Sequence, residues 1–182
     1  MSQAPEITDI TELFDRPSLE VPDVLRRHGL LESTQVEDLR PADLRPFEVN
    51  AAPLVRLDPR HPHIGNHGMY ASFPSGLHTF FTPPELLIWG TGDNYAYLIL
   101  YFQNLVAGSY SASIEMQVWV NSKVSVTATG SAGVTVSSGS TSTPVTFSVP
   151  VKPNANGMAV VSMTPGTTDQ GFSWFGTSLT KI

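Results

Sequence analysis

Three histidines in the segment HPHIGNHGM (residues 61–69) are the residues whose types and spacing best suit metal chemistry. His61, His63 and His67 follow the pattern H-x-H-x3-H. Imidazole nitrogens are common ligands of zinc, copper and iron. One hypothesis is therefore a metal ion bound by all three side chains.

The H-x-H pair resembles the cupin motif, which jelly-roll metalloenzymes use, but the neighbouring residues depart from that motif. The motif has a glutamate near the place that His67 occupies, and it seats its histidine pair on a strand. Here Pro62 separates the first two histidines, and Gly65 and Gly68 surround the third. Because proline and glycine are typical of loops, the competing interpretation is a set of solvated or hydrogen-bonded loop histidines.

Other catalytic groups are scarce, and the sequence predicts a protein that is not an enzyme and has no cofactor. The chain has no cysteine, which excludes disulfides, thiolate nucleophiles and thiolate zinc sites. No G-x-S-x-G motif accompanies the abundant serines. After residue 60, the carboxylates that could act as acid or base are Glu85, Asp93, Glu115 and Asp169.

Aromatic residues form the second candidate site. Alternate residues are apolar in YSASIEMQVWV (110–120), which predicts a half-buried strand, yet Trp119 falls on the polar face. In a second predicted strand, 94–102, the side opposite the aliphatic face carries three tyrosines: Tyr95, Tyr97 and Tyr101. If the two strands pair as a hairpin, all four aromatic residues share one outer surface.

Three interpretations of this aromatic surface remain open. The rings lie beneath the N-terminal part of the chain, or they anchor a subunit interface, or they stack on the C–H faces of sugar rings. Large exposed aromatic patches are uncommon on monomers. We therefore expect the rings to be covered, either by the chain's own N-terminal part or by another subunit.

The elements that must position these residues are short strands. Beyond the two strands above, apolar residues alternate in five more segments separated by turn sequences: 123–129, 132–138, 144–151, 157–163 and 171–182. Many short strands without a helical pattern after residue 70 are typical of a sandwich. The sequence predicts an all-β fold, an antiparallel β-sandwich or jelly roll.

The N-terminal part differs from this body in charge. Residues 1–60 contain 19 of the 26 charged residues, including every arginine. We therefore predict two parts, a charged N-terminal arm over residues 1–66 and a charge-poor β-sandwich body over residues 67–182.

Short helices broken by proline are predicted in the arm. The segment VPDVLRRHG places Pro22 at a helix start and Gly29 at its stop. Two further helices are predicted, one over residues 5–14 and one that begins at Thr34. Helices of this length are marginal alone in water, so we expect them to dock on the body of the same chain or on a neighbouring subunit.

Charge and composition limit the classes of binding partner and the locations that we expect for the protein. The net charge of −6 argues against binding to nucleic acid, which requires clustered basic residues. No apolar run is long enough to span a membrane. The first residues do not resemble a signal peptide, so we expect synthesis in the cytoplasm. A particle, or the extracellular space after release without a leader, is the expected final location.

The leading functional hypothesis is a non-enzymatic subunit of a shell, particle or appendage that assembles with copies of itself, since a charge-poor surface favours association. The first alternative is a carbohydrate-binding β-sandwich module with Trp119 and the tyrosines as its platform. The second is a metal-dependent jelly-roll enzyme that uses the histidines.

Overall fold

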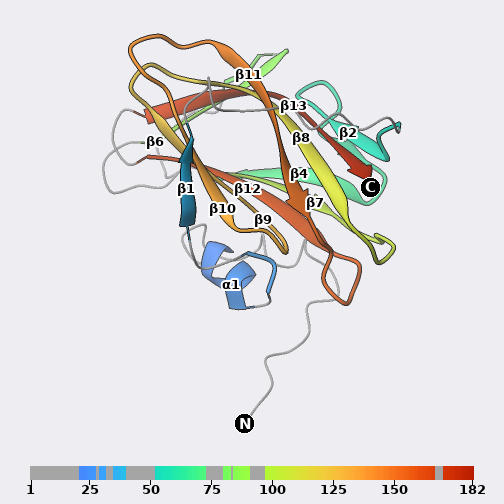
Figure 1. Cartoon of the computed structure of the whole chain (residues 1–182). Coiled ribbons are helices and arrows are strands. Elements are labelled where there is room, and N and C mark those ends of the chain that lie inside the picture. The colour runs from blue at the N-terminus through green and yellow to red at the C-terminus, as the bar shows by residue number, and fades with distance from the viewer. Residues whose placement is uncertain are drawn as a thin grey trace.

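Two β-sheets face each other in the computed structural model, which describes residues 21–27, 29–31, 35–39, 52–72, 80–82, 84–90, 97–166 and 170–182 (Figure 1). The seven-stranded sheet contains, in spatial order, β1 (Gln35–Leu39), β10 (Gly133–Ser137), β9 (Lys123–Ala128), β12 (Ala159–Pro165), β7 (Tyr97–Phe102), β4 (His67–Ser72) and β3 (His63–Ile64). The six-stranded sheet contains β11 (Pro144–Val151), β8 (Tyr110–Val118), β13 (Gln170–Lys181), β6 (Glu85–Gly90) and β5 (Phe80–Thr82), and β2 (Val55–Leu57) also pairs with β13.

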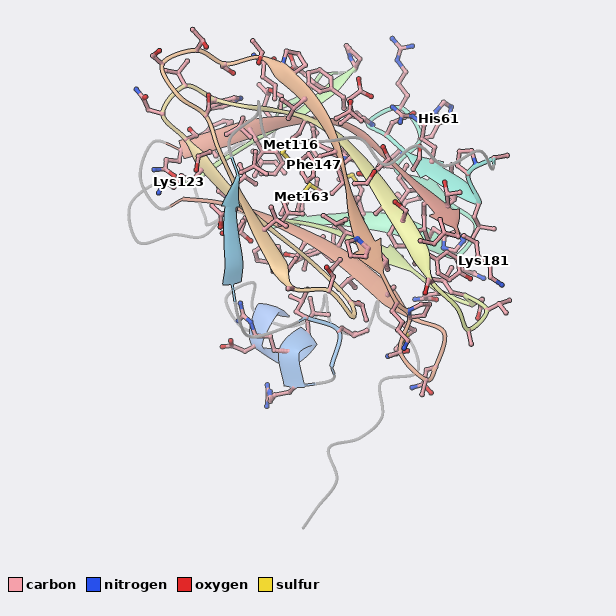
Figure 2. All side chains as sticks on the ribbon, in the orientation of Figure 1. His61, Met116, Lys123, Phe147, Met163 and Lys181 are labelled. Atoms are coloured by element: carbon pink, nitrogen blue, oxygen red, sulfur yellow. The ribbon has the colours of Figure 1, made fainter. Side chains whose placement is uncertain are left out.

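The apolar residues of the alternating strands fill the space between the sheets. On β8, five alternate side chains are each at most 2% exposed: Tyr110, Ala112, Ile114, Met116 and Val118. They belong to the same core cluster as Leu98, Leu100 and Phe102 of β7. Figure 2 shows Met116, Phe147 and Met163 between the sheets, whereas His61, Lys123 and Lys181 lie at the periphery.

The prediction of an all-β antiparallel sandwich is confirmed. The seven predicted segments correspond to β7 through β13, with ends that differ by a few residues. Val120 was expected on the inner face with the apolar residues of β8, but it is 48% exposed because the strand ends at Val118 and the chain turns at Asn121. One described pairing is parallel, that of β1 with β10.

Helix α1 (Val21–Arg27) ends where the sequence predicts. Gly29 has a φ of 69°, and the two bonds Gly29 N–H to Arg26 O and Leu30 N–H to Leu25 O close the last turn. This is the Schellman arrangement, in which glycine is favoured because it adopts a positive φ at little cost. The turn directs Leu30 back against the same apolar surface as Leu25.

That surface is the outer side of the seven-stranded sheet, away from the six-stranded one (Figure 1). Leu25, Leu30 and Leu31 form a second core cluster, separate from the core between the sheets, with Tyr97, Ile99, Met158 and Val160 of the body. The Thr129 hydroxyl donates to the Leu30 carbonyl at 2.7 Å and accepts from the Val160 N–H at 2.9 Å. The described part of the arm around α1 therefore docks on its own body.

Other described parts of the arm are strands. The helix expected from Thr34 is a wrong prediction, because residues 35–39 form β1 and extend the seven-stranded sheet. The boundary expected after residue 66 falls between β3 and β4, which are paired neighbours in one sheet. The helix expected over residues 5–14 lies outside the described residues.

No helix within the described ranges has the length and apolar character needed to cross a membrane.

Candidate functional site

The three histidines do not converge on a common point. His63 and His67 lie on β3 and β4, and the register pairs His63 with Gly68 and Ile64 with His67. Residues paired across a ladder point to the same side, and successive residues of one strand point to opposite sides. His63 and His67 therefore lie on opposite faces of the hairpin, and one metal ion cannot bind all three imidazoles.

Each histidine has a different partner. His63 Nδ1 is 3.4 Å from the Tyr101 hydroxyl. His67 Nδ1 accepts from the Gln103 backbone N–H at 3.3 Å, and burial lowers the pKa of His67. Across the described part of the chain, no group of three His, Asp or Glu side chains is placed to hold a metal ion. These contacts fit the interpretation of hydrogen-bonded histidines better than the metal-site hypothesis. His63 and His67 nevertheless lie on short strands rather than in a loop.

His61 lies in a tight turn with Asp58. The Asp58 carboxylate accepts the backbone N–H groups of Arg60 and His61 at 2.9 and 2.8 Å, and the His61 imidazole is 3.3 Å away. Partial burial alone would raise the pKa of Asp58, but the two backbone donors together with His61 outweigh it and lower that pKa. The contacts explain His61 as part of a stabilised turn.

The condition for a shared aromatic surface, a hairpin between 94–102 and 110–120, is not met, because β7 and β8 belong to different sheets. Tyr97 is 1% exposed and packs under α1, so the chain's own arm covers it. Tyr101 is partly buried beside that cluster. Tyr95 lies outside the described residues. Tyr97 and Tyr101 therefore do not share a surface with Trp119.

Trp119 instead lies on the outer face of the six-stranded sheet, the side away from the seven-stranded sheet. Its indole stacks with that of Trp89, with ring centroids 6.1 Å apart and planes inclined by 27°. Both rings remain partly exposed. The described arm segments lie elsewhere, with α1 on the other sheet and β2 at the Thr177–Leu179 end of β13.

Backbone and side-chain contacts fix the position of this tryptophan pair, Trp89 and Trp119. Both residues flank Gly171 of β13, through the register of Trp89 with Gly171 and a 3.0 Å bond from Trp119 N–H to Gly171 O. A Cβ on Gly171 would lie 2.8 Å from both Trp119 Cε3 and Trp89 Cβ. Trp119 Nε1 donates to the Ser173 hydroxyl at 3.2 Å. The indole is thus oriented along β13.

A third aromatic ring on this face comes from a β-bulge. The register of β13 against β8 skips Phe175, because Trp174 pairs with Met116 and Gly176 pairs with the next residue, Glu115. Such a bulge places two successive residues on the same side of the sheet. Phe175 therefore shares the outer face with Gly171, Ser173 and Gly176, and it is partly exposed.

An ion-pair cluster of Arg56, Asp58 and Glu115 borders the aromatic residues. Arg56 Nη2 is 3.1 Å from Glu115 Oε2, and Arg56 Nε is 3.8 Å from Asp58 Oδ2. The side chains of Arg56 and Glu115 are 43% and 44% exposed. Exposed pairs of this kind contribute little to stability, so their charged groups can also bind a ligand.

Between the ion-pair cluster and the tryptophan pair, the described side chains of this face on β8 and β13 are uncharged. Gln117 lies between Glu115 and Trp119 on β8, and its amide donates to the Ser142 hydroxyl at 3.0 Å. Ser173 is the corresponding residue of β13. The face thus offers stacked rings, neutral hydrogen-bonding groups and one ion-pair cluster, which together suit a ligand that is apolar on one side and hydroxyl-rich on the other.

Of the predicted site residues that the structure describes, only Trp119 belongs to this face, and sequence reasoning missed Trp89, Phe175 and Arg56. Trp89 ends the apolar run ELLIWG, whose alternation is weak because Leu86, Leu87 and Ile88 are consecutive. Phe175 follows Trp174 directly in the sequence. Only the register of β13 shows that the Trp174 ring is buried and that the Phe175 ring faces outward.

No protein-family model matches the chain, and no curated protein sequence matches it. Among solved structures, a family GH115 4-O-methyl-α-glucuronidase is 10% identical with a TM-score of 0.47, over 76% of this chain and 19% of that chain. The module TmCBM61, solved with β-1,4-galactotriose, is 10% identical with a TM-score of 0.39, over 63% and 88% of the two chains. The carbohydrate-binding module CBM36, solved with calcium and xylotriose, is 14% identical with a TM-score of 0.38, over 70% and 100%.

The present chain therefore spans about a fifth of the length of the glucuronidase. At these identities and TM-scores, the fold assignment rests on the strand pairing described above, and the ligands in the neighbours' names belong to those proteins.

Proposed function

We propose that the protein binds a glycan, without catalysis, on the outer face of the six-stranded sheet. The observation that carries the proposal is the tryptophan pair, two partly exposed and stacked indoles that are fixed over Gly171 and by Ser173. Aromatic rings offer flat apolar surfaces to the C–H faces of sugars. A fixed ring loses little conformational entropy when a ligand binds.

The polar side chains near the tryptophan pair support the same ligand class. A sugar hydroxyl both donates and accepts hydrogen bonds. Gln117 offers amide donors and a carbonyl acceptor, and the Arg56–Glu115 pair offers a charged donor next to a charged acceptor. Bonds to charged groups are stronger than neutral ones, so these residues suit the hydroxyl edge of a sugar whose apolar face contacts the indoles.

Binding without catalysis is supported by how the titratable groups are arranged. Glu115 is paired with Arg56, and Asp58 is already occupied by two backbone donors and His61. The three histidines lie apart, with His63 and His67 on opposite faces of the β3–β4 hairpin and His61 in the turn with Asp58. Most glycoside hydrolases place two carboxyl groups on either side of the scissile bond, and in this cluster Arg56 contacts both carboxylates.

The competing proposal is that copies of the protein assemble through the tryptophan pair. It follows from the charge-poor body, since a surface with few charges favours association. The six-stranded sheet is less suited to assembly by strand addition, because β11 forms one of its edges and contains Pro144 and Pro150. Proline cannot donate a ladder hydrogen bond and is a common protection of sheet edges.

The test compares glycan binding and mass for three forms of the full chain, namely wild type, Trp119→Ala and Tyr101→Ala. Tyr101 is the matched control, a partly buried aromatic residue on the other sheet. We expect the wild type and Tyr101→Ala to bind the same ligands on a glycan array, and Trp119→Ala to lose them while its mass in light scattering is unchanged. A Trp119→Ala protein that binds glycans normally, or that only dissociates, would contradict the proposal.

A further inference from the structure

We infer that the ligand is a neutral oligosaccharide that lies along β8 and β13, from the tryptophan pair to Phe175 and the Arg56–Glu115 pair. This inference rests on the proposed glycan-binding function and specifies its ligand. It excludes a single sugar as the full ligand, and it excludes an acidic sugar chain.

The length of the site follows from the strand geometry. Glu115 and Gln117 are alternate residues on one side of β8, and Trp119, the residue directly after the strand, continues this row through its bond to Gly171, so the ends of the row are four residues apart. A strand rises about 3.4 Å per residue, which separates Trp119 from Glu115 by about 14 Å. Contacts at both ends of this row require a ligand longer than one sugar ring.

The bulge provides the second apolar contact of the row. Without the extra residue, regular alternation would place a single outer residue of β13 opposite Glu115. With it, Phe175 and Gly176 both face outward there. Gly176 leaves room for the Arg56 guanidinium, since a Cβ at this position would lie 2.8 Å from Arg56 Cζ. Phe175 thus adds a ring beside the ion pair, as the tryptophan pair does at the other end.

The charges of the row decide between neutral and acidic sugars. The ion-pair cluster contains two carboxylates and one guanidinium, and Arg56 contacts both carboxylates. A carboxylate on the ligand would have to displace Glu115 or Asp58 from Arg56 and would then lie near both of them. A hydroxyl pair can instead donate to Glu115 and accept from Arg56 without breaking their contact.

The experiment titrates the full chain with cello-, xylo- and galacto-oligosaccharides of one to four rings, and with oligogalacturonates of the same lengths, by calorimetry. For the neutral series that binds, we expect the affinity to increase at least about fivefold from one ring to three. The acidic series should bind more weakly at every length.

Two substitutions test the role of Phe175. We expect Phe175→Ala to remove most of the gain in affinity from one ring to three, because the apolar contact at the far end of the row from the tryptophan pair is lost. Phe175→Leu keeps the apolar bulk and should give the same loss of the length effect, which separates the missing ring from a folding defect. Tyr101→Ala should retain the full length effect.

The outcomes separate this inference from the proposed function. If none of the sugars and no glycan on the array binds, the proposed function is wrong, and the inference is wrong with it. If binding requires Trp119 but does not increase with length, or if both Phe175 variants behave like the wild type, only the inference is overturned. Equal affinity for the acidic series would overturn its claim of a neutral ligand.

Discussion

Gly171 is the residue on which the geometry of the tryptophan pair depends. A Cβ at this position would lie 2.6 Å from the Ile88 carbonyl oxygen and 2.8 Å from Trp89 Cβ and Trp119 Cε3. The carbonyl belongs to the paired strand β6 and cannot move away without breaking the ladder. Gly171 therefore permits two large rings to approach each other across a strand.

We expect Gly171→Ala to lower the free energy of unfolding by about 1–3 kcal/mol, as overpacking does in well-packed sites. The near-ultraviolet circular dichroism of the stacked indoles should weaken as well. Gly139→Ala is the matched control, because no atom lies within 4 Å of a Cβ there. Thermal unfolding with equal stability for the two variants would show that the close contacts at Gly171 are not limiting.

His67 is a described histidine whose protonation is coupled to folding. Its pKa is lowered by burial, and its Nδ1 accepts from the Gln103 N–H, which requires a neutral ring with the proton on Nε2. An unfolded histidine takes up its proton near pH 6.5. As the pH falls below that value, the unfolded state binds the proton first, so the stabilising contribution of neutral His67 decreases.

We expect thermal unfolding measured at about pH 7.5, 6.5 and 5.5 to show a falling melting temperature for the wild type. His67→Gln keeps an acceptor for the Gln103 N–H but cannot titrate in this range, so its melting temperature should fall less. The remaining histidines are common to both proteins and cancel in the comparison. Parallel curves for the two proteins would contradict a buried neutral His67.

At the scale of elements, α1 and the residues after it add a second apolar layer on the outer side of the seven-stranded sheet. Leu25 and Leu30 are 0% exposed although α1 has only seven residues. A helix this short is not stable alone, so its contacts with Tyr97, Ile99 and Val160 stabilise it. Those three side chains in turn depend on α1 to exclude water.

We expect Leu30→Ala to destabilise the protein by about 2–5 kcal/mol, since it removes a fully buried side chain from a packed cluster. The control is Ile182→Ala, where the side chain is 54% exposed and little change is expected. Glycan affinity of the folded Leu30→Ala protein should equal that of the wild type, because the tryptophan pair lies on the other sheet. A loss of affinity at temperatures where the variant is folded would indicate that the two sheets are coupled.

Individual elements could be predicted where the determining pattern is local. The alternation in YSASIEMQVWV is sufficient to define β8 and its buried face, and VPDVLRRHG contains both ends of α1. The segment after Thr34 contains a local helix-capping signal, but pairing with β10 makes it a strand. Tertiary contacts can override such local signals because propensities are small.

The candidate site could be predicted only for Trp119, because its other parts come together through pairing of distant segments. Trp89 and Trp119 are neighbours only because β6 and β8 both pair with β13, which follows them in the chain. The tyrosines of β7 were expected to join Trp119 through a hairpin, but the chain crosses to the other sheet after Phe102. The bulge at Phe175 depends on strand register, which no local pattern specifies.

At the scale of the whole molecule, charged residues are concentrated in the first third of the sequence. The net charge is −6, and residues 61–182 contain three lysines and four carboxylates, which gives 3 − 4 = −1. Near the tryptophan pair, the described residues of the face are uncharged, and Arg56 is already paired with carboxylates. Affinity for a neutral oligosaccharide should therefore come from stacking and hydrogen bonds rather than from net electrostatic attraction.

This distribution of charge predicts how binding responds to salt. Because Coulomb interactions of exposed charges are screened within about 3 Å at 1 M salt and about 30 Å at 0.01 M, a charge-driven complex would weaken strongly between these limits. We expect the dissociation constant for the neutral oligosaccharide series to change by less than about twofold over that range. Oligogalacturonates of equal length are the matched probe, and their weaker binding should improve with salt because repulsion from the acidic protein is screened. Calorimetry at both salt concentrations checks this, and a tight complex with a neutral sugar that dissociates in high salt would contradict recognition by the tryptophan pair.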